Sequence, residues 1–143
     1  MKRYITLALA MASTAAIAHS DVKDPNVQKR MAGMKEMAAQ MKTLGAMSKG
    51  QSAFDASAAN AALDAISTQA TSIPALFEVE ANDPQSEALP RIWTDHDTFI
   101  NHAARLNETA ETLTGTVQQK SDLGRAMKQL GQSCRGCHET FKE

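Results

Sequence analysis

The clearest chemistry in the chain is carried by its last ten residues. Two cysteines with two residues between them, Cys134 and Cys137, are followed directly by His138. In such a C-x-x-C-H segment each thiol can add across a vinyl group of haem, and the adjoining imidazole can reach the iron. We interpret the segment as the covalent attachment site of one haem c, with His138 as the proximal axial iron ligand. A reactive dithiol and half of a zinc site share the C-x-x-C spacing and are the alternatives.

The start of the chain predicts the compartment in which this attachment takes place. A basic pair, Lys2 and Arg3, precedes a mostly apolar stretch, and a small-x-small triplet of the kind that signal peptidase cuts ends at Ala18. We therefore expect residues 1–18 to be a cleaved signal peptide and residues 19–143 to form a single mature domain. No segment approaches the about 20 apolar residues of a transmembrane helix. The sequence predicts an exported bacterial protein of the periplasm that is not an integral membrane protein.

Charge and cysteine content limit the classes of partner and of cross-link. The leader takes two of the 15 basic residues and none of the 16 acidic ones, so the mature domain has a net charge of −3 with neutral histidines. It has neither a basic run nor basic residues interleaved with aromatic ones, so we do not expect nucleic acid as a partner. A disulfide between the two cysteines would close too small a loop to remove much unfolded-state entropy, which also favours haem.

Apolar residues recur at spacings of three and four along most of the chain, the period of an amphipathic helix. We predict four helices. The first begins after Asp24, which caps it, and ends near Gly50; the second begins after its cap, Asp55, and ends before Pro74. The third begins between Pro90 and Thr94 and ends near Gly115, and the fourth begins near Ser121 or Asp122. Thr94 with Asp97 resembles a capping box. Pro74 to Pro90 lacks periodicity and is expected to form a long crossover loop.

The first and last predicted helices carry apolar stripes. The first stripe comprises Val27, Met31, Met34, Ala38, Met41 and Gly45, flanked by Met37, Leu44 and Met47; the last comprises Leu123, Met127, Leu130, Cys134, Cys137 and Phe141. Residues three and four apart share one helix face, so the two cysteines and His138 converge on one surface. We predict an all-α fold, an antiparallel four-helix bundle with haem in its core. The strand and βαβ pattern of a thioredoxin-like site is missing from the sequence.

With these landmarks the sequence resembles the class II cytochromes c, also called the cytochrome c-prime superfamily. The residues that carry the resemblance are Arg30-x-x-x-Met34, Lys49-Gly50 with Phe54-Asp55, Pro90-Arg91-Ile92-Trp93, and Cys134 to Lys142. The resemblance implies a cleaved leader, a four-helix bundle and a C-terminal haem motif. One branch of the family is low-spin, with a first-helix methionine as sixth ligand, as in the cytochrome c five-fifty-six type. The other is high-spin and five-coordinate, with an open distal face.

Within this resemblance the sequence is similar to the low-spin branch, which implies Met34 as the distal axial iron ligand. The neighbouring Met31 and Met37 are alternatives, and methionines on such a stripe more often fill a core. The resemblance also implies haem contacts for Arg30, through a propionate, for Met31, and for Glu87 of the crossover loop. Solvent-exposed side chains would explain Arg30 and Glu87 equally well.

Three further residues have weaker signals. His96 lies one turn before Phe99 and would permit bis-histidine ligation, but a surface position near a helix start explains it better. Trp93 is expected to be a core aromatic near the haem. Lys142 stands where some relatives have an arginine beside the proximal ligand.

The sequence therefore predicts a monohaem cytochrome that exchanges single electrons with periplasmic redox proteins, as a monomer or homodimer, and is not an enzyme. Histidine and methionine ligation keeps the iron six-coordinate in both redox states and raises its reduction potential. The alternative is a five-coordinate cytochrome c-prime that binds nitric oxide or carbon monoxide at an open distal face. A peroxidase-like enzyme lacks support, because the sequence offers no distal histidine and arginine pair.

Overall fold

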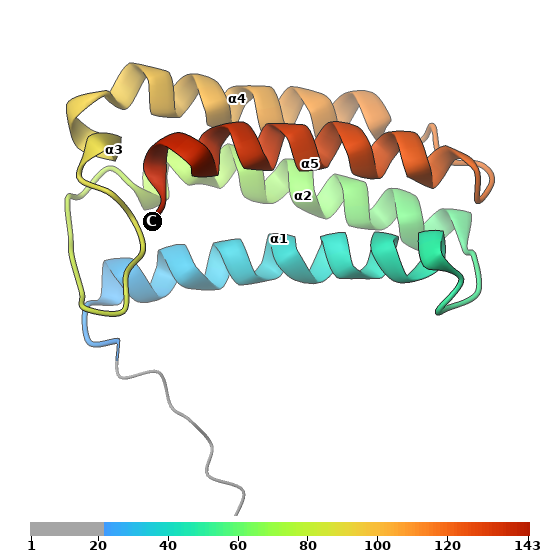
Figure 1. Cartoon of the computed structure of the whole chain (residues 1–143), viewed down its shortest axis with the longest axis horizontal. Helices are drawn as coiled ribbons and strands as arrows, with labels where there is room; N and C mark the ends of the chain where they lie inside the picture. Colours follow the sequence, from blue (N-terminus) through green and yellow to red (C-terminus); the bar gives the residue numbers. More distant parts are fainter. Residues whose placement is uncertain (1–21) are drawn as a thin grey trace, which may run out of the picture.

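Four long helices form an antiparallel bundle, and a short helix precedes the third of them (Figure 1). The computed structural model describes residues 22–143, so the predicted signal peptide lies outside the described residues. The helices are α1 Pro25–Lys49, α2 Ala56–Leu76, α3 Arg91–Thr94, α4 His96–Leu113 and α5 Asp122–Phe141. Within the described range the only β pairing is an isolated bridge between Ala88 and Lys142. The predicted all-α four-helix bundle is confirmed.

The helices do not pack equally tightly against one another. In Figure 1, α1 and α5 lie toward the viewer, and α2 and α4 lie behind them. α2 packs extensively against both α1 and α4, and α5 packs against α4, whereas the contact between α1 and α5 is the least extensive of those between neighbouring long helices. The bundle is therefore loosest along the seam between the helix with the methionines and the helix with the two cysteines.

The ends of α1 follow the signals in the sequence. One carboxylate oxygen of Asp24 accepts hydrogen bonds from the backbone N–H groups of Asn26 and Val27, at 2.7 and 3.1 Å. Pro25, which has no N–H to satisfy, occupies the first turn. At the other end Gly50 has a φ of 73°, a left-handed conformation that side chains with a Cβ rarely adopt. Asp55 caps α2 in the same way through the N–H of Ala58.

Two predicted boundaries are wrong. α2 continues through Pro74 to Leu76, because a proline in the last turn removes only one backbone hydrogen bond and the N–H of Phe77 still closes the helix. The third predicted helix is divided at Asp95, whose φ and ψ of −128° and 49° break the chain into α3 and α4. Asp95 rather than Thr94 therefore precedes α4, and the predicted capping box is not formed.

The stripe predicted for α1 combines two different faces of that helix. The buried residues of α1 are Val27, Arg30, Gly33, Met37, Leu44 and Met47. Two members of the predicted stripe are not buried: Met31 is 40% exposed, and Ala38 is exposed. Gly33 lies against α2 so closely that a Cβ there would be 3.2 Å from a methyl group of Leu76. One face of α1 thus packs on α2, and the face that carries Met31 and Ala38 borders a cavity.

Candidate haem site

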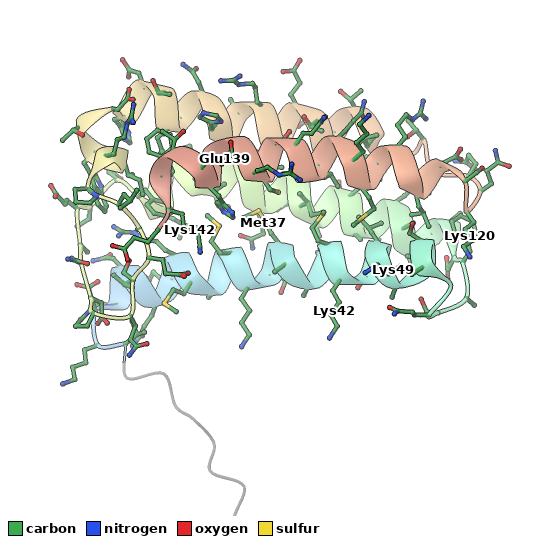
Figure 2. The ribbon with its side chains drawn as sticks, viewed as in Figure 1. Met37, Lys42, Lys49, Lys120, Glu139 and Lys142 are labelled. Carbon is green, nitrogen blue, oxygen red and sulfur yellow. The ribbon has the colours of Figure 1, made fainter. Side chains whose placement is uncertain are left out.

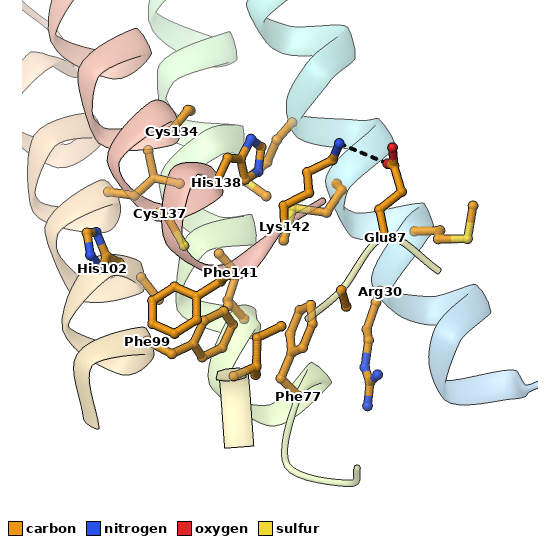
Figure 3. Close-up of a pocket in the computed structure, with 18 of the residues that line it drawn as sticks. Arg30, Phe77, Glu87, Phe99, His102, Cys134, Cys137, His138, Phe141 and Lys142 are labelled. Carbon is orange, nitrogen blue, oxygen red and sulfur yellow. Dashed lines mark ion pairs between the residues drawn. The ribbon is translucent and has the colours of Figure 1, made fainter. Parts of the chain in front are cut away.

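An apolar cavity of about 440 Å³ opens between α1 and α5, closed at the back by α4 and at one end by the crossover loop (Figure 3). Its volume lies in the range of small-molecule and cofactor pockets, roughly 300–1,000 Å³. Most of its wall is formed by methionine, phenylalanine and aliphatic side chains. The residues that bring chemistry to it are Met34 on α1, Glu87 on the loop, His102 on α4, and Cys134, Cys137 and His138 on α5.

The two cysteines lie on successive turns of α5, and both are half-buried free thiols. Burial raises the pKa of Cys134, and burial together with the neighbouring Cys134 raises the pKa of Cys137 to about 11. Thiol groups of catalytic or redox dithiols have lowered pKa values, so this pair lacks the character of a reactive dithiol. Nor do the described residues contain a cluster of three or more side chains that could hold a metal ion, which the zinc alternative would need.

His138 lies on the cavity side of α5, one residue beyond Cys137, and its ring is open to the cavity. Desolvation by the pocket wall and then the positive charge of Lys142 lower the pKa of His138, while Glu87 acts in the opposite direction. The shift therefore favours the neutral form of the imidazole. A neutral ring has a nitrogen lone pair, which is what iron ligation requires.

The wall of the cavity on α1 is rich in thioether sulfur. Met31, Met34, Met37 and Met41 all line it, and Met34 is half-buried between the exposed Met31 and the buried Met37. Because α1 packs beside α5, this wall lies on the other side of the cavity from the cysteine-bearing helix. The structure thus brings Met34 and His138, 104 positions apart in the sequence, to one cavity.

Arg30 is not the solvent-exposed arginine that was one interpretation of the sequence: it is only 3% exposed. Its guanidinium donates hydrogen bonds to three carbonyl oxygens at the end of α2 and beyond it, those of Leu76 and Ala81 at 2.9 Å each and that of Val79. It also lies over the rings of Phe77 and Trp93, 4.8 and 5.1 Å from their centroids. In Figure 3 the guanidinium points away from the cysteines. Arg30 anchors the crossover loop, and its contact with a haem propionate stays a prediction.

Glu87 and Lys142 meet at the mouth of the cavity. Their side chains form an ion pair at 3.0 Å, drawn as a dashed line in Figure 3. Backbone hydrogen bonds from Leu89 to Phe141 and from Glu143 to Glu87 join the same two segments. The crossover loop is thus fastened to the end of α5. Glu87 lies at the edge of the cavity, and its contact with haem stays a prediction.

The histidines of α4 differ in position. His96 is exposed and does not line the cavity, as the surface interpretation predicts; its Nδ1 lies 3.3 Å from the Ile92 carbonyl. His102, to which the sequence assigned no role, does line the cavity, and its ring lies 5.9 Å from that of Phe141. A Cβ on Gly136, inside the haem motif, would be 3.6 Å from the His102 ring. No periodic signal marks His102, because its importance depends on the packing of α4 against α5.

Aromatic side chains form the floor of the cavity. The ring of Phe99 makes edge contacts with Phe77 at 4.9 Å and with Phe141 at 5.3 Å between centroids. Trp93 lies beside this cluster, where its indole N–H donates to the carbonyl of Phe77 at 2.9 Å. Phe141 belongs to the apolar stripe predicted for the last helix, but Phe77 lies in the segment without periodicity, and the sequence offers no signal for it.

The fold, the motif and the cavity together define a class of protein: a four-helix bundle that binds haem through a motif in its last helix. The chain belongs to the cytochrome c-prime family. The family model described as Cytochrome C' matches residues 25–142. Among its relatives, the cytochrome c-556 of Agrobacterium fabrum is 38% identical over 117 residues, which cover 81% of this chain and 80% of that protein. The cytochrome c' of Rhodopseudomonas palustris is 30% identical over 135 residues, covering 94% and 90%.

Solved structures show the same fold. Cytochrome c' from Rhodopseudomonas palustris superposes with a TM-score of 0.76 at 28% identity, covering 85% of this chain and 98% of that one. The structural model of oxidised cytochrome c556 from the same organism gives the same four values. The chain accordingly binds haem c covalently, and the cavity fits it: two half-buried thiols, a neutral imidazole and an apolar wall lie together. None of the helices within residues 22–143 combines the length and apolarity needed to cross a membrane.

Proposed function

We propose that this protein is a periplasmic one-electron carrier whose haem c is attached through Cys134 and Cys137 and ligated by His138 and Met34. Haem c, when bound, supplies a one-electron iron couple whose potential depends on its axial ligands. The observation that carries the proposal is the thioether wall of α1, with Met34 half-buried, on the opposite side of the cavity from the cysteine-bearing helix. The relatives named cytochrome c-556 and the leader-like start of the chain support the assignment.

Each of the four residues has a separate part in this function. The two cysteines fix the haem covalently on α5, so that it cannot be lost in the periplasm. The lowered pKa of His138 favours the neutral ring, whose nitrogen lone pair is free to ligate iron. The thioether of Met34 favours the ferrous state and raises the potential. The apolar wall limits access of water, which also tunes the potential.

A second candidate is the five-coordinate state with an open distal face that binds nitric oxide or carbon monoxide. The relative named cytochrome c' and the opening of the cavity along the α1–α5 seam favour it. The two candidates differ in whether Met34 occupies the distal side. An absorption spectrum of the oxidised and reduced holoprotein separates them, because methionine ligation gives low-spin iron.

The decisive variant is Met34→Leu, which keeps the volume of the side chain but removes the sulfur. We expect it to turn low-spin iron high-spin, lower the reduction potential and permit binding of carbon monoxide. Met31→Leu is the matched control, because Met31 lies one turn before Met34 on α1 and also lines the cavity, and this change should leave the spin state unaltered. A wild-type protein that is already high-spin, or a Met34→Leu variant with the wild-type spectrum, would favour the open-face candidate.

A further inference from the structure

Exposed basic residues follow both edges of the seam between α1 and α5. On α1 they are Lys35, Lys42 and Lys49, and on α5 they are Lys128 and Arg135, all of them exposed. Within each helix the members are seven positions apart, which is close to two helical turns. Each set therefore forms a stripe along one side of its helix.

The α1 stripe runs along the solvent edge of the helix face that meets α5. Lys35 is one turn from both Met31 and Ala38, which line the cavity. Lys42 is three positions before Gly45, where a Cβ would be 3.7 Å from the terminal methyl group of Met127 on α5. The stripe thus lies on the solvent side of α1, next to the face that meets α5, and in Figure 2 the side chain of Lys42 projects from α1 away from α5.

The α5 stripe borders the same seam from the other side. Lys128 follows Met127, the residue that reaches Gly45, and Arg135 is three positions before His138 on the cavity wall. The ammonium group of Lys120, in the turn before α5, lies 3.1 Å from the Cβ position of Gly50 and joins the two stripes at one end. Figure 2 looks onto this face. We call Lys35, Lys42, Lys49, Lys128 and Arg135 the basic rim.

The basic rim belongs to a chain whose overall charge is negative, so its charge is local. α1 carries five basic residues and one acidic residue, and α5 carries three and two. By contrast α4 carries three acidic residues and one basic residue, and residues 77–90 carry four acidic residues and none that is basic. Within residues 22–143 no member of the basic rim forms an ion pair. Helix by helix, basic residues therefore outnumber acidic ones on α1 and α5, with Glu139 as an exposed acidic residue of α5, while acidic residues predominate on α4, behind them, and in the crossover loop.

We propose that the basic rim is the docking surface for an acidic redox protein, whose carboxylates pair with it and so place the partner's redox centre over the cavity. This inference rests on the proposed electron-transfer function and specifies the charge of the partner. Complementary charges at a rim act mainly on the rate of encounter and make it fall with salt. If the net negative charge of the whole protein governed the encounter instead, the rate with an anionic partner would rise with ionic strength. The direction in which salt changes the rate therefore distinguishes the local charge of the basic rim from the overall charge of the protein.

The first test is stopped-flow oxidation of the ferrous holoprotein by hexacyanoferrate(III), an anion, and by tris(phenanthroline)cobalt(III), a cation. We expect the rate with the anion to fall as ionic strength rises from about 10 to about 200 mM, where the Debye length shortens from roughly 30 to under 10 Å. The cation should show a flat or rising rate. A rate with the anion that rises with salt would contradict the basic rim as a docking surface.

Charge reversal tests the location of the surface. Lys42→Glu and Lys128→Glu should each slow the reaction with the anion roughly 3–10-fold at low ionic strength and flatten its salt dependence. Lys29→Glu is the matched control, because Lys29 lies in the groove between α1 and α2, away from the seam, and the change in net charge is the same. It should slow the reaction less than about 2-fold. Equal effects of Lys29→Glu and Lys42→Glu would overturn the proposal.

Reduction of the ferric protein by flavodoxin, a strongly acidic electron-transfer protein, extends the test to a macromolecule. We expect Lys42→Glu and Lys128→Glu to slow this reaction more than Lys29→Glu does. Unchanged rates for Lys42→Glu and Lys128→Glu would contradict docking of a protein on the basic rim. Slow exchange of the wild-type protein with every probe at every ionic strength would instead contradict the electron-transfer function itself. Absorption spectra of all variants, which should match the wild type, verify that the haem site is intact.

Discussion

The two ends of the bundle differ in how they are filled. At the end where α1 connects to α2 and α4 to α5, side chains fill the core, whereas at the other end the helices surround a cavity. At this first end, the turn end, Leu44, Leu63 and Leu123 are fully buried. Asn60 of α2 fastens the α4–α5 turn, because its amide donates to the carbonyl of Val117 at 2.8 Å and accepts from the N–H of Gly115 at 2.8 Å.

At the haem end, which comprises the cavity and the crossover loop, the protein does not fill its own interior. Side chains that point into the cavity have no protein neighbours on that side, so they lose the contacts that a packed core supplies. Polar groups replace apolar packing around it: Arg30 holds the loop after α2, and Asp83 holds the segment before α1. We therefore expect the turn end to be held by its own packed core, and the haem end to depend on the cofactor and on a few buried hydrogen bonds.

The largest effect is expected from removing the covalent attachment. Cys134→Ala with Cys137→Ala should abolish the covalent haem and lower the free energy of unfolding by about 4 kcal/mol or more, because a tightly held ligand no longer stabilises the native state. Hydrogen exchange measured by mass spectrometry should accelerate in the crossover loop and the second half of α5. Helix segments around Leu63 and Leu123 should stay protected. Uniform loss of protection at both ends would contradict the comparison.

A smaller effect is expected at Arg30. Arg30→Gln removes the guanidinium that satisfies the carbonyl oxygens of Leu76, Val79 and Ala81, and should lower the free energy of unfolding by about 2–4 kcal/mol. Urea unfolding measures the loss, and hydrogen exchange should locate it in residues 77–90. Leu63→Ala is the control at the turn end: it should cost about 2–5 kcal/mol without faster exchange in that loop.

The smallest effect concerns pH. Asp83 accepts hydrogen bonds from the backbone N–H groups of Gln85 and Lys23, at 3.0 and 2.9 Å, and these bonds hold its pKa below the ordinary value of 3.8. A carboxyl whose pKa is lower in the folded state stabilises that state above its unfolded pKa, and this contribution disappears as pH falls through the folded pKa. Asp83→Asn should therefore be less stable than the wild type at pH 7.

The difference between Asp83→Asn and the wild type should shrink as the pH of the unfolding measurement falls below 3.8 and through the folded-state pKa, because the wild-type carboxyl then also becomes protonated. Urea unfolding at pH 7 and at a series of pH values below 3.8 provides the comparison. A difference that stays the same over the whole series would show that the charge of Asp83 has no part in holding the loop.

Much of the fold could be predicted from short-range signals. The start of α1 depends on Asp24 and Pro25 and its end on Gly50, all of which act within one turn of the helix end. The beginning of α5 is also marked locally, because the carboxylate of Asp122 accepts hydrogen bonds from the backbone N–H groups of Gln118 and Gln119 in the preceding turn. The boundaries that were wrong, at Pro74 and Asp95, lie where the crossover loop meets the bundle, and there tertiary contacts decide how far a helix continues.

The sequence by itself predicted the haem attachment segment, because Cys134, Cys137 and His138 are close together in the chain and helix geometry alone brings them to one surface. It also determined the helical class of the fold. Only the tertiary structure decided that α1 has two faces, that Arg30 is buried and holds the loop, that His102 lies against the haem motif, and that the basic rim follows the seam along which the cavity opens. These properties depend on how helices distant in sequence pack together, and a periodic pattern does not specify which neighbour each face meets.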